Sequence, residues 1–119
     1  MKALIPALAL VLLASAAQAD VAGLVGHTVV GATPDGLTRR IQLRADRTYR
    51  ISVSDGSTST GTWSTKGDKL CYFRIQPEPA PGDLNPLCVE GLDGHKLGDA
   101  WTTTGHHGLP MKMTVVRGP

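Results

Sequence analysis

A pair of adjacent histidines near the carboxyl end of the chain has the residue type needed to hold a metal ion. His106 and His107 stand between two glycines. Adjacent side chains of an extended strand point to opposite faces, so both rings reach one ion only where the glycines let the chain bend. A zinc site also needs a third ligand, for which His95 and Asp99 are nearest in sequence. We therefore expect two solvated histidines and no metal or other cofactor; a metalloprotein or enzyme that uses His106 and His107 is an alternative.

The acidic residues offer little for acid–base catalysis, which needs a titratable side chain within reach of the proton that it transfers. Many of the aspartates stand beside a glycine, where turn formation explains them: Asp35, Asp55, Asp68 and Asp93. The chain contains neither Gly-x-Ser-x-Gly nor a phosphate-binding glycine loop that ends in Lys followed by Ser or Thr. The sequence therefore predicts that the protein is not an enzyme.

Two cysteines, Cys71 and Cys88, are the only ones in the chain. No Cys-x-x-Cys spacing is present and no histidine lies between them, so thiolate metal ligation has no support. In an exported protein, an even number of cysteines indicates disulfide bonding. The sequence therefore predicts a structural disulfide, and closing a loop of this length contributes about 3 kcal/mol to stability through chain entropy.

The one concentrated charge feature is a run of arginines in a predicted hairpin: Arg39, Arg40, Arg44, Arg47 and Arg50. Alternation places Arg40 and Arg44 on the outer face of one strand, and Arg50 can join them across the turn. Guanidinium groups pair well with phosphates and carboxylates, so the patch could bind an anionic glycan, lipopolysaccharide phosphates or an acidic protein loop. The alternative is a solvated strand face. Arg39 falls on the apolar side, where we expect its stem to pack and its head to reach water.

The elements that must position these residues are short strands. The 14 glycines and 8 prolines recur at the spacing of all-β domains. Between them apolar and polar residues alternate, most clearly from Tyr49 to Ser54. The predicted strands cover residues 24–33, 37–44, 49–54, 61–65, 69–76, 87–92, 100–104 and 111–116. They predict a small antiparallel meander of about eight strands that forms a closed or nearly closed barrel, with a β-sandwich as the alternative.

A proline-rich stretch and the small size of the domain bear on where ligands bind. Four prolines between Pro77 and Pro86 exclude a strand and predict a protruding surface loop, whose ends the disulfide would tie together. We expect no sizeable interior pocket, because so short a chain has few apolar side chains to spare and small barrels can be filled by their own residues.

The first 19 residues have the layout of a secretory signal peptide, with Lys2, an apolar run, and small residues at Ala17 and Ala19. Cleavage there leaves residues 20–119 as a single all-β domain. No later stretch has the roughly 18 apolar residues of a membrane-spanning helix, so stable membrane insertion is not expected. The leader suits a Gram-negative bacterium and predicts a periplasmic protein, with secretion as the alternative. A formal net charge of +2 gives no reason to expect nucleic acid as a partner, and we expect a monomer.

Several short motifs together resemble a known group of proteins. Gly61-Thr62-Trp63 is followed by Leu70-Cys71-Tyr72 and, after a variable loop, by Cys88. This pattern resembles an uncharacterised family of small exported proteobacterial β-barrel proteins described as lipocalin-like, and Leu24, Gly26, Thr28 and Gly31 are similar to that group's opening motif. The resemblance covers residues 24–88. It implies an exported β-barrel and no known activity; true lipocalins carry Gly-x-Trp on their first strand, so a lipocalin-type cavity is not implied.

These observations predict an exported periplasmic binding or interaction module of unknown specific role, engaging an envelope protein or an anionic glycan. The candidate interaction residues are Arg40, Arg44, Arg50 and Trp63; Trp63 has a plug at the barrel end as its simpler role. Two alternatives stay open. One is a small-ligand carrier of lipocalin-like type, and the other is the metalloprotein or enzyme built around His106 and His107.

Overall fold

The computed structural model describes residues 19–105 and 108–118, and all regular structure in this part of the chain is β. The expected signal peptide, apart from Ala19, and the pair His106 and His107 lie outside the described residues. Among the described residues, no helix is long and apolar enough to cross a membrane. The strands are β1 (Thr28–Ala32), β2 (Thr38–Leu43), β3 (Thr48–Val53), β4 (Thr58–Lys66), β5 (Lys69–Gln76), β6 (Leu87–Val89), β7 (Ala100–Thr104) and β8 (Pro110–Val116).

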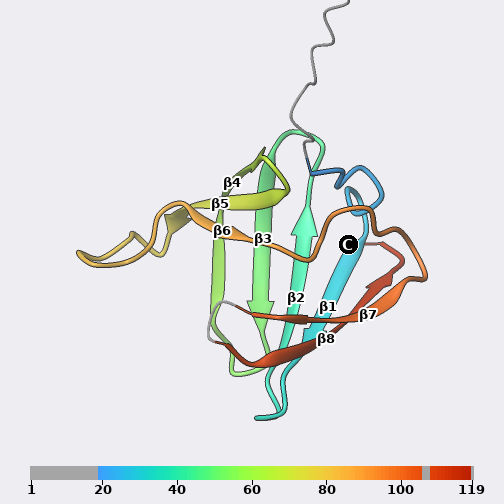
Figure 1. Cartoon of the computed structure of the whole chain (residues 1–119). Coiled ribbons are helices and arrows are strands. Elements are labelled where there is room, and N and C mark those ends of the chain that lie inside the picture. The colour runs from blue at the N-terminus through green and yellow to red at the C-terminus, as the bar shows by residue number, and fades with distance from the viewer. Residues whose placement is uncertain (1–18, 106–107, 119) are drawn as a thin grey trace, which may run out of the picture.

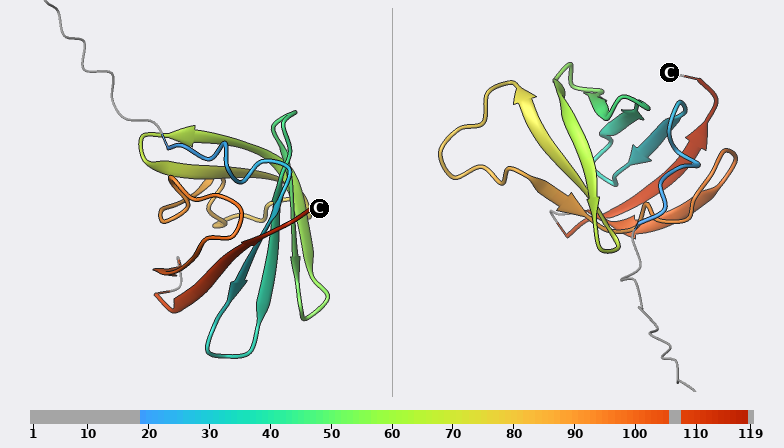
Figure 2. Two further views of the ribbon diagram at one scale, coloured as in Figure 1. Left: turned by 90° about the vertical axis from the view of Figure 1, so that its right-hand side faces the viewer. Right: turned by 90° about the horizontal axis from the view of Figure 1, so that it is seen from above.

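The strands form one antiparallel sheet in the order β6-β5-β4-β3-β2-β1-β8-β7. Strands that follow one another in the chain are paired, except that β6 and β7 stand at the two edges of the sheet. The last strand returns to the first, with Thr28 opposite Val116. Figure 2 shows the sheet curled around its concave side into a half-barrel. The predicted eight-stranded meander is confirmed, and its single sheet is not a β-sandwich.

The edge strands β6 and β7 do not pair with each other, and we call the gap between them the seam. Contacts between single residues bridge it. The indole Nε1 of Trp101 in β7 donates to the carbonyl of Gly91, just after β6, at 2.7 Å. Gly91 has a φ of 91°, and a Cβ built on it would lie 2.2 Å from Oγ1 of Thr103. These contacts hold β7 against the segment that follows β6. They take the place of the hydrogen bonds that two paired strands would form.

Alternate strand residues point into the concave side and form the core, as the two-residue period of a strand requires. Ile41 of β2 and Tyr49 of β3 are buried, whereas their sequence neighbours Arg40 and Arg50 are exposed. Further core residues from the strands are Val29, Leu43, Trp63, Leu70, Tyr72, Met113 and Val115. The alternation that predicted the strands therefore also separates the core face from the outer face.

One end of the half-barrel is closed by the residues that precede β1. Leu24 is completely buried. The Gly26 amide donates to the carbonyl of Leu43 at 3.0 Å, and the His27 amide donates to that of Leu24 at 3.1 Å. Because the chain turns here to cross the end of the sheet, β1 begins at Thr28, and the expectation that it begins at Leu24 was wrong.

Two other strand boundaries differ from the expectation by three residues, and the remaining differences are of one residue. The strand β4 begins at Thr58 instead of Gly61, because Asp55 closes a tight turn by accepting hydrogen bonds from the amide and hydroxyl of Ser57, at 2.9 and 2.7 Å. The strand β6 ends at Val89 instead of at residue 92, because Gly91 takes a positive φ and turns the chain out of the sheet.

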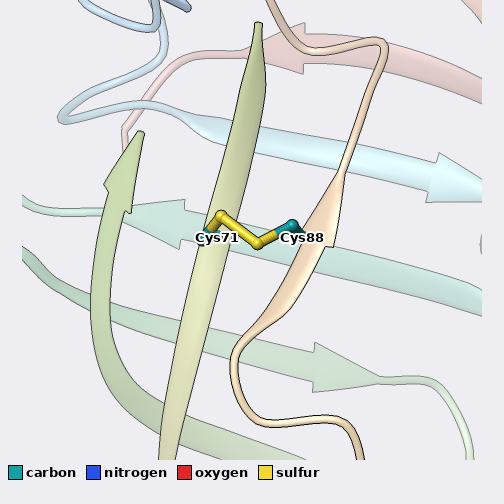
Figure 3. The surroundings of a disulfide bond; sticks show 2 residues. All are labelled: Cys71 and Cys88. Atoms are coloured by element: carbon teal, nitrogen blue, oxygen red, sulfur yellow. A yellow bond between two sulfur atoms is a disulfide. The ribbon is translucent and has the colours of Figure 1, made fainter. Parts of the chain in front are cut away.

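The disulfide Cys71–Cys88 joins β5 to β6 (Figure 3). The two cysteines lie opposite each other in the register of these strands. The predicted disulfide is therefore confirmed. It holds an edge strand of three residues to the sheet and closes the loop over residues 77–86, which projects from the body of the protein (Figure 1). Because disulfides persist in oxidising compartments, this bond supports a location outside the cytoplasm.

Candidate functional site

A pocket of about 160 Å³ opens on the concave face of the half-barrel. The middle of the sheet contributes Ile41 and Ile51 to its lining, and β8 contributes Met111. Both sides of the seam contribute as well, with Val89 from β6 and Thr103 from β7. A concave, mainly apolar lining with a few polar groups is the usual form of a small-molecule site.

We expected no sizeable interior pocket, and this expectation was wrong for the part of the half-barrel next to the seam. At the end near the residues before β1, the interior is filled by Leu24, Leu43 and Trp63. Toward the seam, β6 ends at Val89 and no strand continues the sheet to β7. Side chains from the two edges therefore line an open space, and the missing strand pair produces the pocket.

Three charged side chains belong to the lining. Asp35 and Glu90 are exposed, and Arg39 is half-buried. The hydroxyl of Thr33 and the amide of Leu37, and to a lesser degree the Arg39 guanidinium, hold the pKa of Asp35 below its ordinary value. Asp35 is therefore ionised at neutral pH and lies near Arg39. The charged side chains stand in the more exposed part of the pocket lining.

Tyr72 is the buried polar member of the lining, with 6% of its surface exposed. Its ring lies 4.9 Å from that of Tyr49, centroid to centroid. Its hydroxyl has no hydrogen-bond partner among the described residues. Burial, and then the neighbouring Tyr49, raise the pKa of Tyr72 above its ordinary value, so the hydroxyl keeps its proton at neutral pH.

The structure places Arg40 of β2 and Arg50 of β3 on the outer face of the sheet, as alternation predicted, and Arg44 follows β2 directly. Arg40 lies opposite Ser52, so Arg50, two residues from Ser52 on β3, is diagonal to it. All three arginines are exposed. The Nε of Arg50 donates to the Ser52 hydroxyl at 3.4 Å, and none of the three arginines makes an ion pair with the described residues. We call these three residues the arginine surface.

Trp63 does not join the arginine surface. It is buried on the concave side, and its indole Nε1 donates to the carbonyl of Arg44 at 3.0 Å. The guanidinium carbon of Arg47 lies 4.5 Å from the centroid of its ring, a cation–π arrangement. This position is that of a plug at the closed end of the half-barrel.

The histidine pair His106 and His107 lies outside the described residues, so the structure does not place it. In the described part of the chain, no group of three or more His, Cys, Asp or Glu side chains could hold a metal ion. The expected third ligands are themselves engaged. His95 stacks on Trp101 with ring centroids 3.4 Å apart, and its Nδ1 lies 3.3 Å from a carboxylate oxygen of Asp99.

The loop over residues 77–86 contains no strand, as its prolines predicted, and is held in shape by Arg74. The guanidinium of Arg74 donates to Asp83 at 2.5 Å and to the carbonyl of Pro77 at 2.9 Å. Leu84 is 72% exposed on this loop. An exposed apolar side chain on an ordered loop suits a protein contact, so engagement of an envelope protein stays a prediction.

Sequence reasoning missed the pocket and assigned neither Tyr72 nor Arg39 to a binding site. One signal was present: Arg39 is in phase with Ile41 and Leu43, which places a charged residue on the core face of β2. A charged side chain at a core-facing position indicates that this part of the core face is accessible to water. Tyr72 gave no signal, because an unpaired buried hydroxyl is visible only in three dimensions.

In comparisons with known proteins, the chain matches no family model, no curated protein and no solved structure. The resemblance to small exported lipocalin-like proteins therefore stays a prediction, and the functional argument depends on the geometry of the site.

Proposed function

We propose that this protein is an exported, periplasmic binding module that takes a small and largely apolar molecule into its concave-face pocket. The observation that carries the proposal is the pocket of about 160 Å³ with aliphatic and thioether walls from β2, β3, β6 and β8. Its volume is close to that of an engineered cavity of about 150 Å³ that binds benzene. This puts the small-ligand alternative ahead of a pure protein-contact role, and binding ahead of catalysis.

Filling the pocket should weaken ligand binding. Val89→Phe adds a ring to the β6 wall, and we expect the affinity for toluene, measured by titration calorimetry, to fall about tenfold or more. Val30→Phe on β1 is the matched control, because Val30 does not line the pocket and alternates with the buried Val29. Equal toluene binding in both variants, or no saturable binding in the wild type, would contradict the proposal.

A second candidate function is the binding of an anionic glycan on the arginine surface. The specific observation in its favour is that Arg40, Arg44 and Arg50 are exposed together and make no ion pair with the described residues. Unpaired guanidinium groups on one face are suited to sulfate, phosphate or carboxylate groups of a polymer. This function is independent of the pocket, which lies on the other face of the sheet.

The arginine surface is tested with dextran sulfate as the probe. The triple variant Arg40→Ala, Arg44→Ala and Arg50→Ala should bind it about tenfold more weakly than the wild type at low salt. A control triple variant that removes the same charge elsewhere is Lys66→Ala, Lys69→Ala and Arg117→Ala, all at exposed positions. Equal losses in the two variants would show a net-charge effect and reject a site; wild-type binding should also weaken as salt increases.

A further inference from the structure

We propose that the ligand of the pocket is a neutral ring compound, about the size of a phenol, with one hydroxyl or carbonyl oxygen that pairs with the Tyr72 hydroxyl. The inference depends on the proposed function, because it names the ligand class for the same pocket. It is argued from an unpaired buried group, from the charges in the lining and from the volume.

The unpaired group is the Tyr72 hydroxyl. Buried polar groups in folded proteins are almost always hydrogen-bonded, so an exception needs an explanation. The neighbouring Tyr49 does not supply the partner, because its own hydroxyl bonds to the side chain of Ser59. Tyr72 belongs to the pocket lining, but its hydroxyl oxygen exposes less than 1 Å² of surface, so a ligand oxygen in the pocket completes its hydrogen bonding once the lining side chains shift to admit it. A protonated hydroxyl can both donate to a ligand carbonyl and accept from a ligand hydroxyl.

The charges in the lining favour a neutral ligand. Arg39 already lies close enough to Asp35 and Asp55 to interact with both carboxylates. Glu90 adds a further acidic group to the lining. An anionic ligand would therefore meet more negative than positive charge, and a buried ionic group without its own partner is strongly disfavoured.

The volume restricts the size of the ligand. A pocket of about 160 Å³ accommodates a single six-membered ring with one or two substituent atoms, by comparison with the cavity of about 150 Å³ that binds benzene. The pocket is open on one side, so a ligand with a long alkyl chain would leave most of that chain outside it. Size, neutrality and the free hydroxyl together define the proposed class.

The test compares p-cresol with toluene, which differ by one hydroxyl, in the wild type and in Tyr72→Phe. The measured quantity is the ratio of the toluene Kd to the p-cresol Kd, obtained by titration calorimetry. We expect this ratio to fall about tenfold in Tyr72→Phe, while the toluene Kd itself changes little. Tyr49→Phe is the matched control, and its ratio should equal that of the wild type because Tyr49 does not line the pocket.

A second measurement does not depend on Tyr72→Phe folding. The chain has two tyrosines, so in Tyr49→Phe the only tyrosine is Tyr72. With ¹³C at the ζ carbon of tyrosine, its single NMR signal should shift on saturation with p-cresol and much less with toluene.

The outcomes separate the two proposals. If neither compound binds the wild type, the proposed function and this inference both fail. If toluene binds but the Kd ratio is the same in the wild type and in Tyr72→Phe, or if the ¹³C signal responds equally to both compounds, this inference is overturned and the pocket remains a binding site.

Discussion

Gly61→Ala lowers the free energy of unfolding by about 3 kcal/mol, the largest effect that we expect from adding one methyl group to this protein. Gly61 is buried in β4, where the register with β5 shifts between Thr60 and Gly61. A Cβ at this position would lie 2.0 Å from the carbonyl oxygen of Phe73. That atom belongs to the main chain of β5, so relief requires a shift of a whole strand.

A matched control is Gly31→Ala, at a buried glycine in β1. Its Cβ would meet the methyl group of Met111 at 2.7 Å and the sulfur of Met113 at 3.0 Å. Methionine side chains are flexible and can move aside, so we expect a loss below about 1 kcal/mol. Urea unfolding of both variants measures the difference, and equal losses would show that the close approach of β4 and β5 does not restrict residue 61.

Removal of the disulfide, by Cys71→Ser with Cys88→Ser, should lower the free energy of unfolding by about 3 kcal/mol. The physical reason is that the cross-link restricts the unfolded chain over the loop between the cysteines. The reduced wild-type protein should unfold at the same urea concentration as the double variant, since both lack the same bond. An unchanged unfolding midpoint in both would show that the bond contributes nothing to stability.

The same change should weaken ligand binding before the protein unfolds as a whole. Leu87 and Val89 of β6 line the pocket, and β6 pairs with the sheet through only three residues. Without the disulfide this short edge strand detaches at low energetic cost, because local opening requires the loss of few contacts. Toluene titration of the reduced protein at a urea concentration well below the midpoint measures the effect.

Strand content could be predicted because it depends on local alternation. The run from Tyr49 to Val53 has a two-residue period and forms the expected strand. The arginine surface followed from the same rule, since Arg40 and Arg50 are out of phase with buried neighbours. Local rules also predicted the loop over residues 77–86 from its prolines.

The seam and the pocket could not be predicted, because they depend on contacts between distant residues. The strand β6 ends where Gly91 takes a positive φ, a conformation that a glycine permits but does not require, and the hydrogen bond from Trp101 to the Gly91 carbonyl then holds this segment against β7. The pocket arises where β6 and β7 do not pair, and that is a property of the whole sheet. Tyr72 illustrates the same limit, because its hydroxyl lacks a partner only as a result of how β3 and β5 pack.

The pairing of β1 with β8 has a consequence for the order in which the molecule folds. Thr28 and Val116 are opposite each other, so the first and last strands of the sheet are neighbours. Contacts between residues so far apart in sequence form slowly, because a long loop must close before they are gained. Val29 in β1 has no partner on this side until the carboxyl-terminal residues arrive. The local pairs from β2 to β6 can form earlier, but the pair of β1 with β8 forms only after synthesis has passed Val116, so the sheet is completed late.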